Sequence, residues 1–152
     1  MAMARYLIVA NQTLGGEQLI ARLEELAAGE PVTFRFAVPV TDTEGSHQWD
    51  YPPIDRLIPD AHVLARTLAQ ARLEHELARL RRTGIDADGE VVEANPVDRV
   101  RELTLAETFD VVLVSTLPRR LSRWLIGDLP HRLTRALSVP VTHVEGTAGP
   151  SL

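Results

Sequence analysis

The sequence predicts one α/β domain in which helices cover both faces of a central parallel sheet, a doubly wound arrangement. Short apolar runs typical of buried strands alternate with longer amphipathic segments, and helix caps or glycines stand at the junctions. The chain has 152 residues, of which 45% are hydrophobic, so it suits a single domain with a substantial core. We expect the domain to span residues 1–145 and a flexible polar tail to span residues 146–152.

Five segments have the composition of β-strands. The first and the fourth are continuous apolar runs, which are typical of strands buried on both faces, and the second alternates apolar and polar residues. Glu90 and Glu93 in the third segment and Pro140 in the fifth favour the sheet edges, because edge strands tolerate charges and proline cannot donate to a β-ladder. The predicted strands are residues 6–10, 32–40, 90–94, 109–114 and 139–144.

Four helices are predicted between these strands, each with apolar residues at helical spacing. Glycines end the first two, which span residues 17–28 and 60–82. Asn95 and Pro96 begin the third, since asparagine caps a helix well and proline suits its first turn. Asp128 is expected to cap the fourth. The apolar stripe predicted for the second helix is Leu64, Leu68, Leu73, Leu77 and Leu80.

The composition of the chain disfavours several classes of protein. There is no cysteine, so the chain has neither disulfides nor thiolate metal ligands. The formal net charge of -5 disfavours general nucleic-acid binding. The apolar run near the N-terminus is too short for a signal peptide, and no segment approaches the ~20 apolar residues of a membrane-spanning helix. We therefore expect a cytoplasmic protein with no membrane or nucleic-acid partner.

The last third of the chain combines a strand, a loop, a helix and a final strand. The stretch from Val114 to Asp128 contains Leu-Ser-Arg-Trp-Leu-Ile-Gly, and the final strand opens with Val139-Pro-Val. This pattern resembles the universal stress protein family, in which a strand leads into a phosphate-binding loop of the form Gly-x2-Gly-x9-Gly-Ser/Thr. In the order of its elements the resemblance covers nearly the whole chain. It implies a five-stranded sheet of order 3-2-1-4-5 with a Rossmann-like fold, similar to the adenine nucleotide alpha hydrolase fold.

The same resemblance implies a homodimer that pairs through the last strand. Val139, Val141 and Val144 lie on that strand and are expected at the dimer edge. An apolar strand at a sheet edge also favours pairing on physical grounds, because its backbone groups are open to a second chain.

The phosphate-binding loop departs from the family pattern. Val114 and Leu117 replace the first two glycines, Gly127 matches the third, and Asp128 replaces the Ser/Thr. Side chains with a Cβ obstruct a phosphate, and a β-branched residue tolerates positive φ poorly. A carboxylate ~4 Å from a phosphate charge is repelled by roughly 4 kcal/mol at an effective dielectric of 20. We therefore predict that ordinary ATP binding is lost and that no cofactor is bound, with ATP or AMP disfavoured.

Polar residues follow the first and the fourth strand, at the edge where open α/β sheets bind ligands. Asn11 stands where the family usually has an aspartate that helps to hold adenine, and an asparagine can still hydrogen-bond a base. Ordinary turn chemistry is the alternative explanation of these polar residues. The candidate ligand-binding residues are Asn11, Gln12, Thr13, Val38, Ser115, Thr116, Arg119, Arg120, Gly127 and Asp128.

Three arginines in the modified loop are open to two interpretations. Arg119, Arg120 and Arg123 either hold an anion in place of the missing backbone amides or form a solvated basic surface. In the first case the chain would be an ATP- or AMP-binding stress-response protein in which Arg119 and Arg120 replace the loop glycines.

The long segment 41–59 lacks periodicity and contains residues of two chemical kinds. Trp49 and Tyr51 either fold over the crevice as a lid or pack on the surface. The acidic residues and His47 lack a recognised metal-ligand spacing, so we expect no metal site.

No catalytic pattern in the sequence supports an enzyme. There is no Walker loop, no Gly-x-Ser-x-Gly nucleophile elbow and no cysteine nucleophile. His62, His75, His131 and His143 have no nucleophile or carboxylate partner at a diagnostic spacing. We predict a binding or regulatory domain that acts through dimerisation, an unknown small ligand or a protein partner. A small hydrolase that uses the crevice is the third interpretation.

Overall fold

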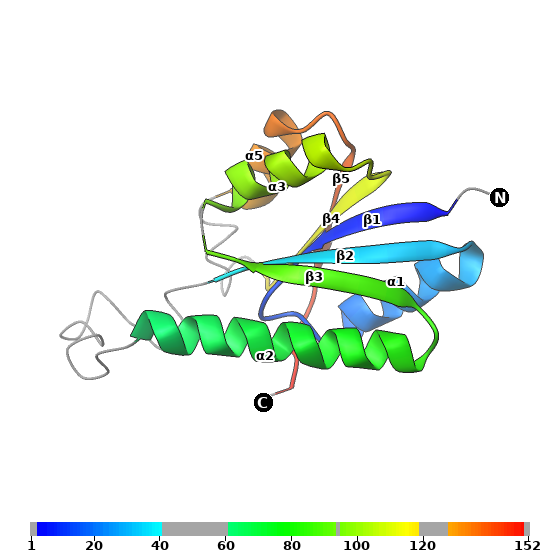
Figure 1. Ribbon diagram of the computed structural model, residues 1–152, viewed down its shortest axis with the longest axis horizontal. Helices are drawn as coiled ribbons and strands as arrows, with labels where there is room; N and C mark the ends of the chain where they lie inside the picture. The colour runs from blue at the N-terminus through cyan, green and yellow to red at the C-terminus, as the bar shows by residue number, and fades with distance from the viewer. Residues whose placement is uncertain (1–2, 41–60, 94, 119–127, 151–152) are drawn as a thin grey trace.

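Five parallel strands form one sheet in the predicted order, β3-β2-β1-β4-β5 (Figure 1). The structure, a computed structural model, describes residues 3–40, 61–93, 95–118 and 128–150. No helix in this described part is long and apolar enough to cross a membrane. The elements are β1 (Ala4–Val9), α1 (Glu17–Gly29), β2 (Val32–Pro39), α2 (Ala61–Arg82), β3 (Asp86–Val92), α3 (Pro96–Ala106), β4 (Val111–Thr116), α5 (Leu129–Ala136) and β5 (Val141–Glu145).

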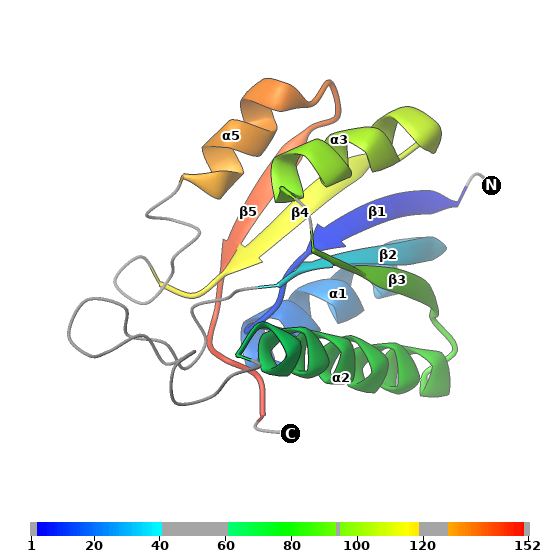
Figure 2. The same cartoon turned by 60° about the vertical axis from the view of Figure 1, so that its left-hand side comes forward.

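Helices cover both faces of the sheet, as predicted (Figure 2). α1 and α2 pack on one face, and α3 and α5 pack on the other. Successive side chains of β1, the central strand, enter opposite layers, because side chains alternate along a strand. Leu7 and Val9 join the core beneath α3 and α5, while Ile8 joins the core beneath α1 and α2. All three are fully buried, which explains the continuous apolar run of this strand.

The two predicted helix caps have different outcomes. The Asn95 carboxamide caps α3 as predicted and accepts hydrogen bonds from the backbone N–H groups of Val97 (3.0 Å) and Asp98 (3.4 Å). The predicted cap at Asp128 is wrong, because this residue has a left-handed backbone with φ +55° and its side chain caps no N–H group. The Asp128 carboxylate instead lies 3.2 Å from Nδ1 of His131. An N-cap side chain reaches the helix from an extended backbone, which Asp128 does not have.

β3 begins at Asp86, earlier than the predicted residue 90, and forms one edge of the sheet as expected. Its first residues include Asp86, Asp88 and Gly89. These residue types are depleted in strands, so the sequence pattern does not indicate that the strand begins at Asp86. Packing explains the glycine, since a Cβ there would lie 2.8 Å from Cβ of Phe36 and 2.9 Å from Cδ1 of Leu73.

β5 forms the other edge of the sheet, as predicted, but begins after Pro140 instead of containing it. The carbonyl of Pro140 accepts a hydrogen bond from the N–H of Val112 at 2.9 Å. Proline thus stands at the entrance to the strand, where only its carbonyl is used.

The buried face of α2 differs from the predicted leucine stripe in the first half of the helix. Ala65 and Ala69 are buried there, whereas Leu64 is 45% exposed. One residue along a helix is a turn of about 100°, so Leu64 and the partly buried Leu68 lie to one side of the face that the alanines bury. The second half follows the prediction, with Leu73, Leu77 and Leu80 buried.

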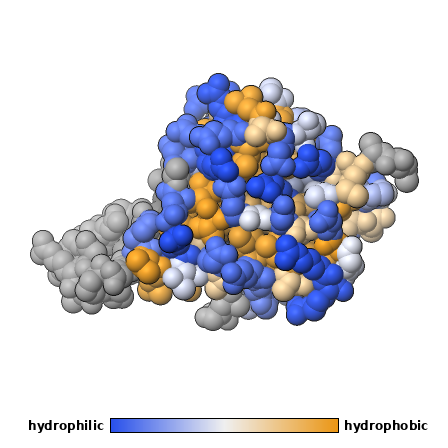
Figure 3. Space-filling model, in the orientation of Figure 1, coloured by the Kyte–Doolittle hydropathy of each residue, from blue (hydrophilic) through white to orange (hydrophobic). Residues whose placement is uncertain are grey.

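Ion pairs occupy the face of β2 and β3 on the side of α3. Glu90 lies between two arginines, with its Oε2 at 2.8 Å from Nε of Arg99 and its Oε1 at 3.4 Å from Arg35. Hydrophilic residues cover much of the side seen in Figure 3, around a hydrophobic band between α3 and α2. The hydrogen bond from Arg99 is the main reason why the pKa of Glu90 is lowered.

We expect Glu90→Gln to reduce the free energy of unfolding by about 1 kcal/mol at neutral pH, because charge-assisted hydrogen bonds are lost. A carboxylate with a lowered pKa in the folded state stabilises the protein above its ordinary pKa, and this contribution is lost as the pH falls through the folded-state value. The parent and the variant should therefore converge in stability as the pH falls below the ordinary glutamate pKa of 4.5. Urea denaturation over a pH series measures this, and a difference that is independent of pH would contradict it.

Candidate functional site

Four polar side chains are buried where β1 and β4 end side by side. Asn11, Thr13, Ser115 and Thr116 are each no more than 2% exposed. Buried polar groups need hydrogen-bond partners. Thr13 and Ser115 pair with each other on the side of α1, and Thr116 pairs with His143 on the side of α5. The predicted juxtaposition of residues 11–13 with residues 115–116 is therefore present, although their side chains face the protein interior.

Thr13 and Ser115 form a hydroxyl pair on the α1 side of the sheet. Their Oγ atoms lie 2.7 Å apart, and either hydroxyl can be the donor. The backbone around Thr13 is a tight turn, in which its carbonyl accepts a hydrogen bond from the N–H of Gly16 at 2.9 Å. This pair joins the β1–α1 loop to the end of β4.

Thr116 faces the opposite side, toward α5. Its Oγ1 lies 2.7 Å from Nε2 of His143 on β5. Thr116 shares its side of the sheet with Val114, which belongs to the core beneath α3 and α5. His143 is exposed and was not predicted to have a partner of this kind. Only the pairing of β4 with β5 brings it to Thr116, so no spacing along the chain could indicate the contact.

Asn11 links three elements. Its Nδ2 donates to the carbonyl of Pro39 at 2.7 Å, and its Oδ1 accepts from the guanidinium of Arg72 at 2.7 Å. The carboxamide thus joins the ends of β1 and β2 to α2, and these bonds fix its orientation. Arg72 was missed by the sequence analysis. Its signal was weak: it stands three residues after the buried Ala69, on the inward side of the helix.

The other predicted ligand residues near β1 and β2 lie in different surroundings. Val38 is fully buried in the core beneath α1 and α2. Gln12 is partly exposed, and its carbonyl accepts a hydrogen bond from the N–H of Gly149 at 2.8 Å. The predicted tail 146–152 therefore contacts this loop, and its predicted flexibility stays a prediction.

Val114, the first altered position of the phosphate loop, lies inside β4. It pairs in register with Val9 and His143 and is fully buried. Asp128 is the only non-glycine residue with a positive φ in the described part of the chain, so Val114 has ordinary strand geometry and the argument from positive φ does not apply to it. Leu117 follows the strand and is partly buried. Arg119, Arg120, Arg123 and Gly127 lie outside the described residues.

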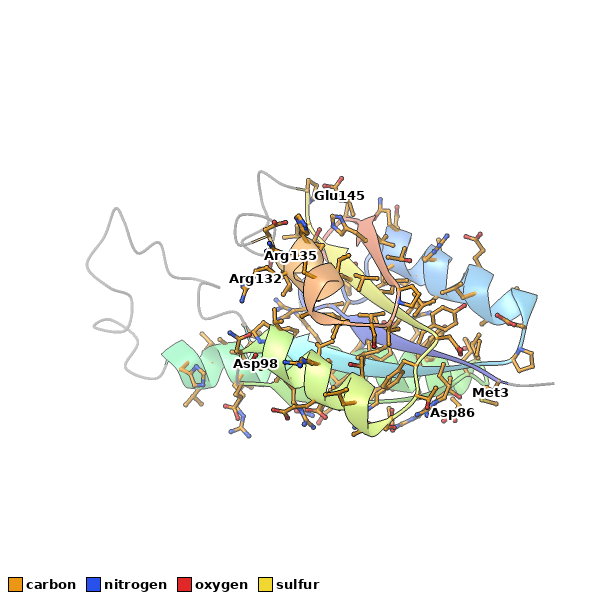
Figure 4. All side chains as sticks on the ribbon, turned by 90° about the horizontal axis from the view of Figure 1, so that it is seen from above. Met3, Asp86, Asp98, Arg132, Arg135 and Glu145 are labelled. Carbon is orange, nitrogen blue, oxygen red and sulfur yellow. The ribbon has the colours of Figure 1, made fainter. Side chains whose placement is uncertain are left out.

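Asp128 brings an exposed negative charge to the start of α5. Its side chain is 58% exposed and lies next to His131. Two arginines, Arg132 and Arg135, lie further along the exposed side of this helix (Figure 4). Among the residues that the structure describes, the start of α5 therefore carries charges of both signs.

Three histidines have side-chain partners, and only the pair of His131 with Asp128 has a spacing, three residues, that helix geometry brings together. His62 lies 3.4 Å from Glu93, His131 lies beside Asp128, and His143 lies beside Thr116. Within the described residues no group of three His, Asp or Glu side chains is arranged to hold a metal ion. The acidic segment around His47, with Trp49 and Tyr51, lies outside the described residues.

Among the described strands β5 pairs with β4 alone and forms the edge of the sheet. The three valines proposed for a dimer edge do not share one side. Val139 and Val141 pack partly against the core beneath α3 and α5, whereas Val144 packs against the core beneath α1 and α2.

The buried hydroxyl pair gives a test of how the site is held together. Thr13→Val should destabilise the protein by about 1–3 kcal/mol, because the hydroxyl of Ser115 is left buried without its partner. Ser115→Ala should reduce the free energy of unfolding less in the Thr13→Val variant than in the parent, because in that variant the Ser115 hydroxyl has already lost its partner. Chemical denaturation of the parent, both single variants and the double variant measures the coupling, and strictly additive losses would contradict the pair.

No protein-family model and no curated protein matches the sequence. Solved structures do match, among them a universal stress protein from Archaeoglobus fulgidus, with a TM-score of 0.59 and 11% identity over 94% of each chain. A universal stress protein family protein from Arabidopsis thaliana, solved with AMP bound, has a TM-score of 0.58 and 10% identity over 93% of this chain and 91% of its own. A universal stress protein in complex with cAMP has a TM-score of 0.54 and 18% identity over 95% of this chain and 98% of its own. The chain therefore has the Rossmann-like α/β fold of the universal stress proteins.

Proposed function

We propose that this protein is a regulatory domain that binds a small polar ligand at the ends of β1 and β4, and that it takes a nucleoside monophosphate in preference to ATP. The observation that carries the proposal is the position of Asp128, an exposed carboxylate at the start of α5. AMP carries about two negative charges and ATP about four, so a fixed carboxylate repels ATP more strongly.

The fold and its neighbours support a nucleotide as the ligand class. Open α/β sheets bind ligands outside the carboxyl ends of their strands, and the buried polar residues of this chain gather there. Two solved structures with the same fold contain AMP and cAMP. A valine at position 114 supports the loss of ordinary ATP binding, because it has a Cβ where the family pattern has a glycine.

A regulatory role is favoured over an enzymatic one by the chemistry of the described residues. The hydroxyl of Thr116 is close to His143, but a nucleophile and base also need a group that orients the base and donors for the developing charge. The contacts of the described residues supply neither to this pair.

We expect ATP to bind more weakly than about 1 mM and AMP to bind about tenfold more tightly than ATP. Asp128→Asn should improve ATP affinity by about fivefold, which is ~1 kcal/mol, and AMP affinity by less. Asparagine suits this position because it tolerates a left-handed backbone, whereas serine has no such preference.

Isothermal titration at low and high salt measures these affinities, and the gain of the variant should shrink in high salt because its origin is electrostatic. His131→Gln is the matched control, because it removes the neighbour of Asp128 and keeps the carboxylate. A low-micromolar dissociation constant for ATP in the parent would contradict the proposal.

We also propose a two-fold symmetric homodimer in which β5 of each copy pairs at the open edge of the sheet. Val139 and Val141 would supply side-chain packing beside the strand pairing. Light scattering should give a dimer at about tens of micromolar, a range in which modest interfaces are populated. Val141→Asp should give a monomer with an unchanged circular dichroism spectrum. A monomeric parent at that concentration would count against the dimer.

A further inference from the structure

The segment that follows β5 lies against the β1–α1 loop. In Figure 2 it leaves β5 and passes toward the side of α1 and α2. Three residues make its hydrogen bonds: the N–H of Gly146 donates to the carbonyl of Thr116 at 2.9 Å, Thr147 donates to the side chain of Gln18 at 2.9 Å, and the N–H of Gly149 donates to the carbonyl of Gln12 at 2.8 Å. We call residues 146–150 the strap.

The strap and the loop approach each other backbone to backbone, and glycines make this possible. A Cβ at Gly149 would collide with the carbonyl of Leu14, and a Cβ at Gly16 would collide with the carbonyl of Thr147. Neither obstacle is a flexible side chain, so a larger residue at either position must displace the strap. The contact between the strap and the loop therefore requires glycine at both positions 16 and 149.

The first and the last hydrogen bond of the strap go to the end of β4 and to the loop after β1, which form the candidate site. Thr116, which receives the first bond, is the last residue of β4, and Gln12, which receives the last, lies between Asn11 and Thr13. Thus one short segment ties the end of β4 to the loop after β1. A segment with these attachments restrains the distance between the two sides of the crevice.

We propose that the strap is a positioning segment that holds the β1–α1 loop in a shape ready for the ligand. Ligand affinity depends on such pre-organisation, because a mobile loop must be ordered when the ligand binds. The role as a ligand-positioning segment rests on the proposed nucleotide function, whereas the docking of the strap on the loop does not. By linkage, a ligand that binds better to the strapped state must also stabilise the strap.

The test is Gly149→Ala in the full chain. Hydrogen exchange in residues 11–16 and 146–150 should accelerate by about tenfold, the change expected when a local contact is opened. AMP affinity should fall by about fivefold, while exchange in the sheet stays as in the parent. Gly29→Ala is the matched control, because nothing lies within 4 Å of a Cβ at Gly29 and neither measurement should change. Gln18→Ala, which removes only the bonds to Thr147, should give a smaller change in the same direction.

AMP added to the parent should slow exchange in residues 146–150, a response that a merely structural tail would not give. Unchanged exchange of residues 11–16 in Gly149→Ala would overturn the strap. Faster exchange with unchanged AMP affinity would overturn its positioning role. Faster exchange in a protein that binds AMP in no variant would leave the strap in place and overturn the nucleotide function.

Discussion

The burial of β1 on both faces is the constraint from which the rest of the structure follows. Leu7 and Val9 require cover on one side and Ile8 requires cover on the other, so helices must lie on both faces of the sheet. β1 also pairs with both β2 and β4. The strand order therefore reverses at β1, and its carboxyl end is the place where an open α/β sheet forms a crevice.

The polar residues at this end serve two purposes that compete with each other. Asn11, Thr13 and Ser115 satisfy one another or nearby backbone and side chains, which fixes the positions of these side chains. The same bonds occupy groups that a ligand would otherwise use. Under the proposed function, a ligand at this end of the sheet would meet few open polar groups and would be recognised by shape and by a small number of contacts.

Much of the fold could be predicted from local pattern, but the contacts of the site could not. Apolar runs and the Asn95 cap are local signals; they gave the order of the strands along the chain and the start of α3, although the bounds of β3, β4 and β5 differ from those predicted. The start of β3 was missed because Gly89 is dictated by Phe36 and Leu73, which lie elsewhere in the chain. The bond between Arg72 and Asn11 joins residues of two separate elements. A bond of this kind depends on tertiary packing, which the spacing of residues along the chain does not predict.

Asp128 illustrates how the same residue type can support opposite conclusions. An aspartate before a helix is ordinarily a cap, which would place its carboxylate over the first N–H groups and neutralise part of its effect. Here the backbone of Asp128 is left-handed and its side chain caps no N–H group, so the carboxylate remains exposed beside His131 of the same helix. Its carboxylate therefore contacts a side chain of the first turn and solvent, and does not contact the first N–H groups of the helix. For this reason the aspartate at this position adds exposed charge near the start of α5 more than it stabilises the helix by capping it.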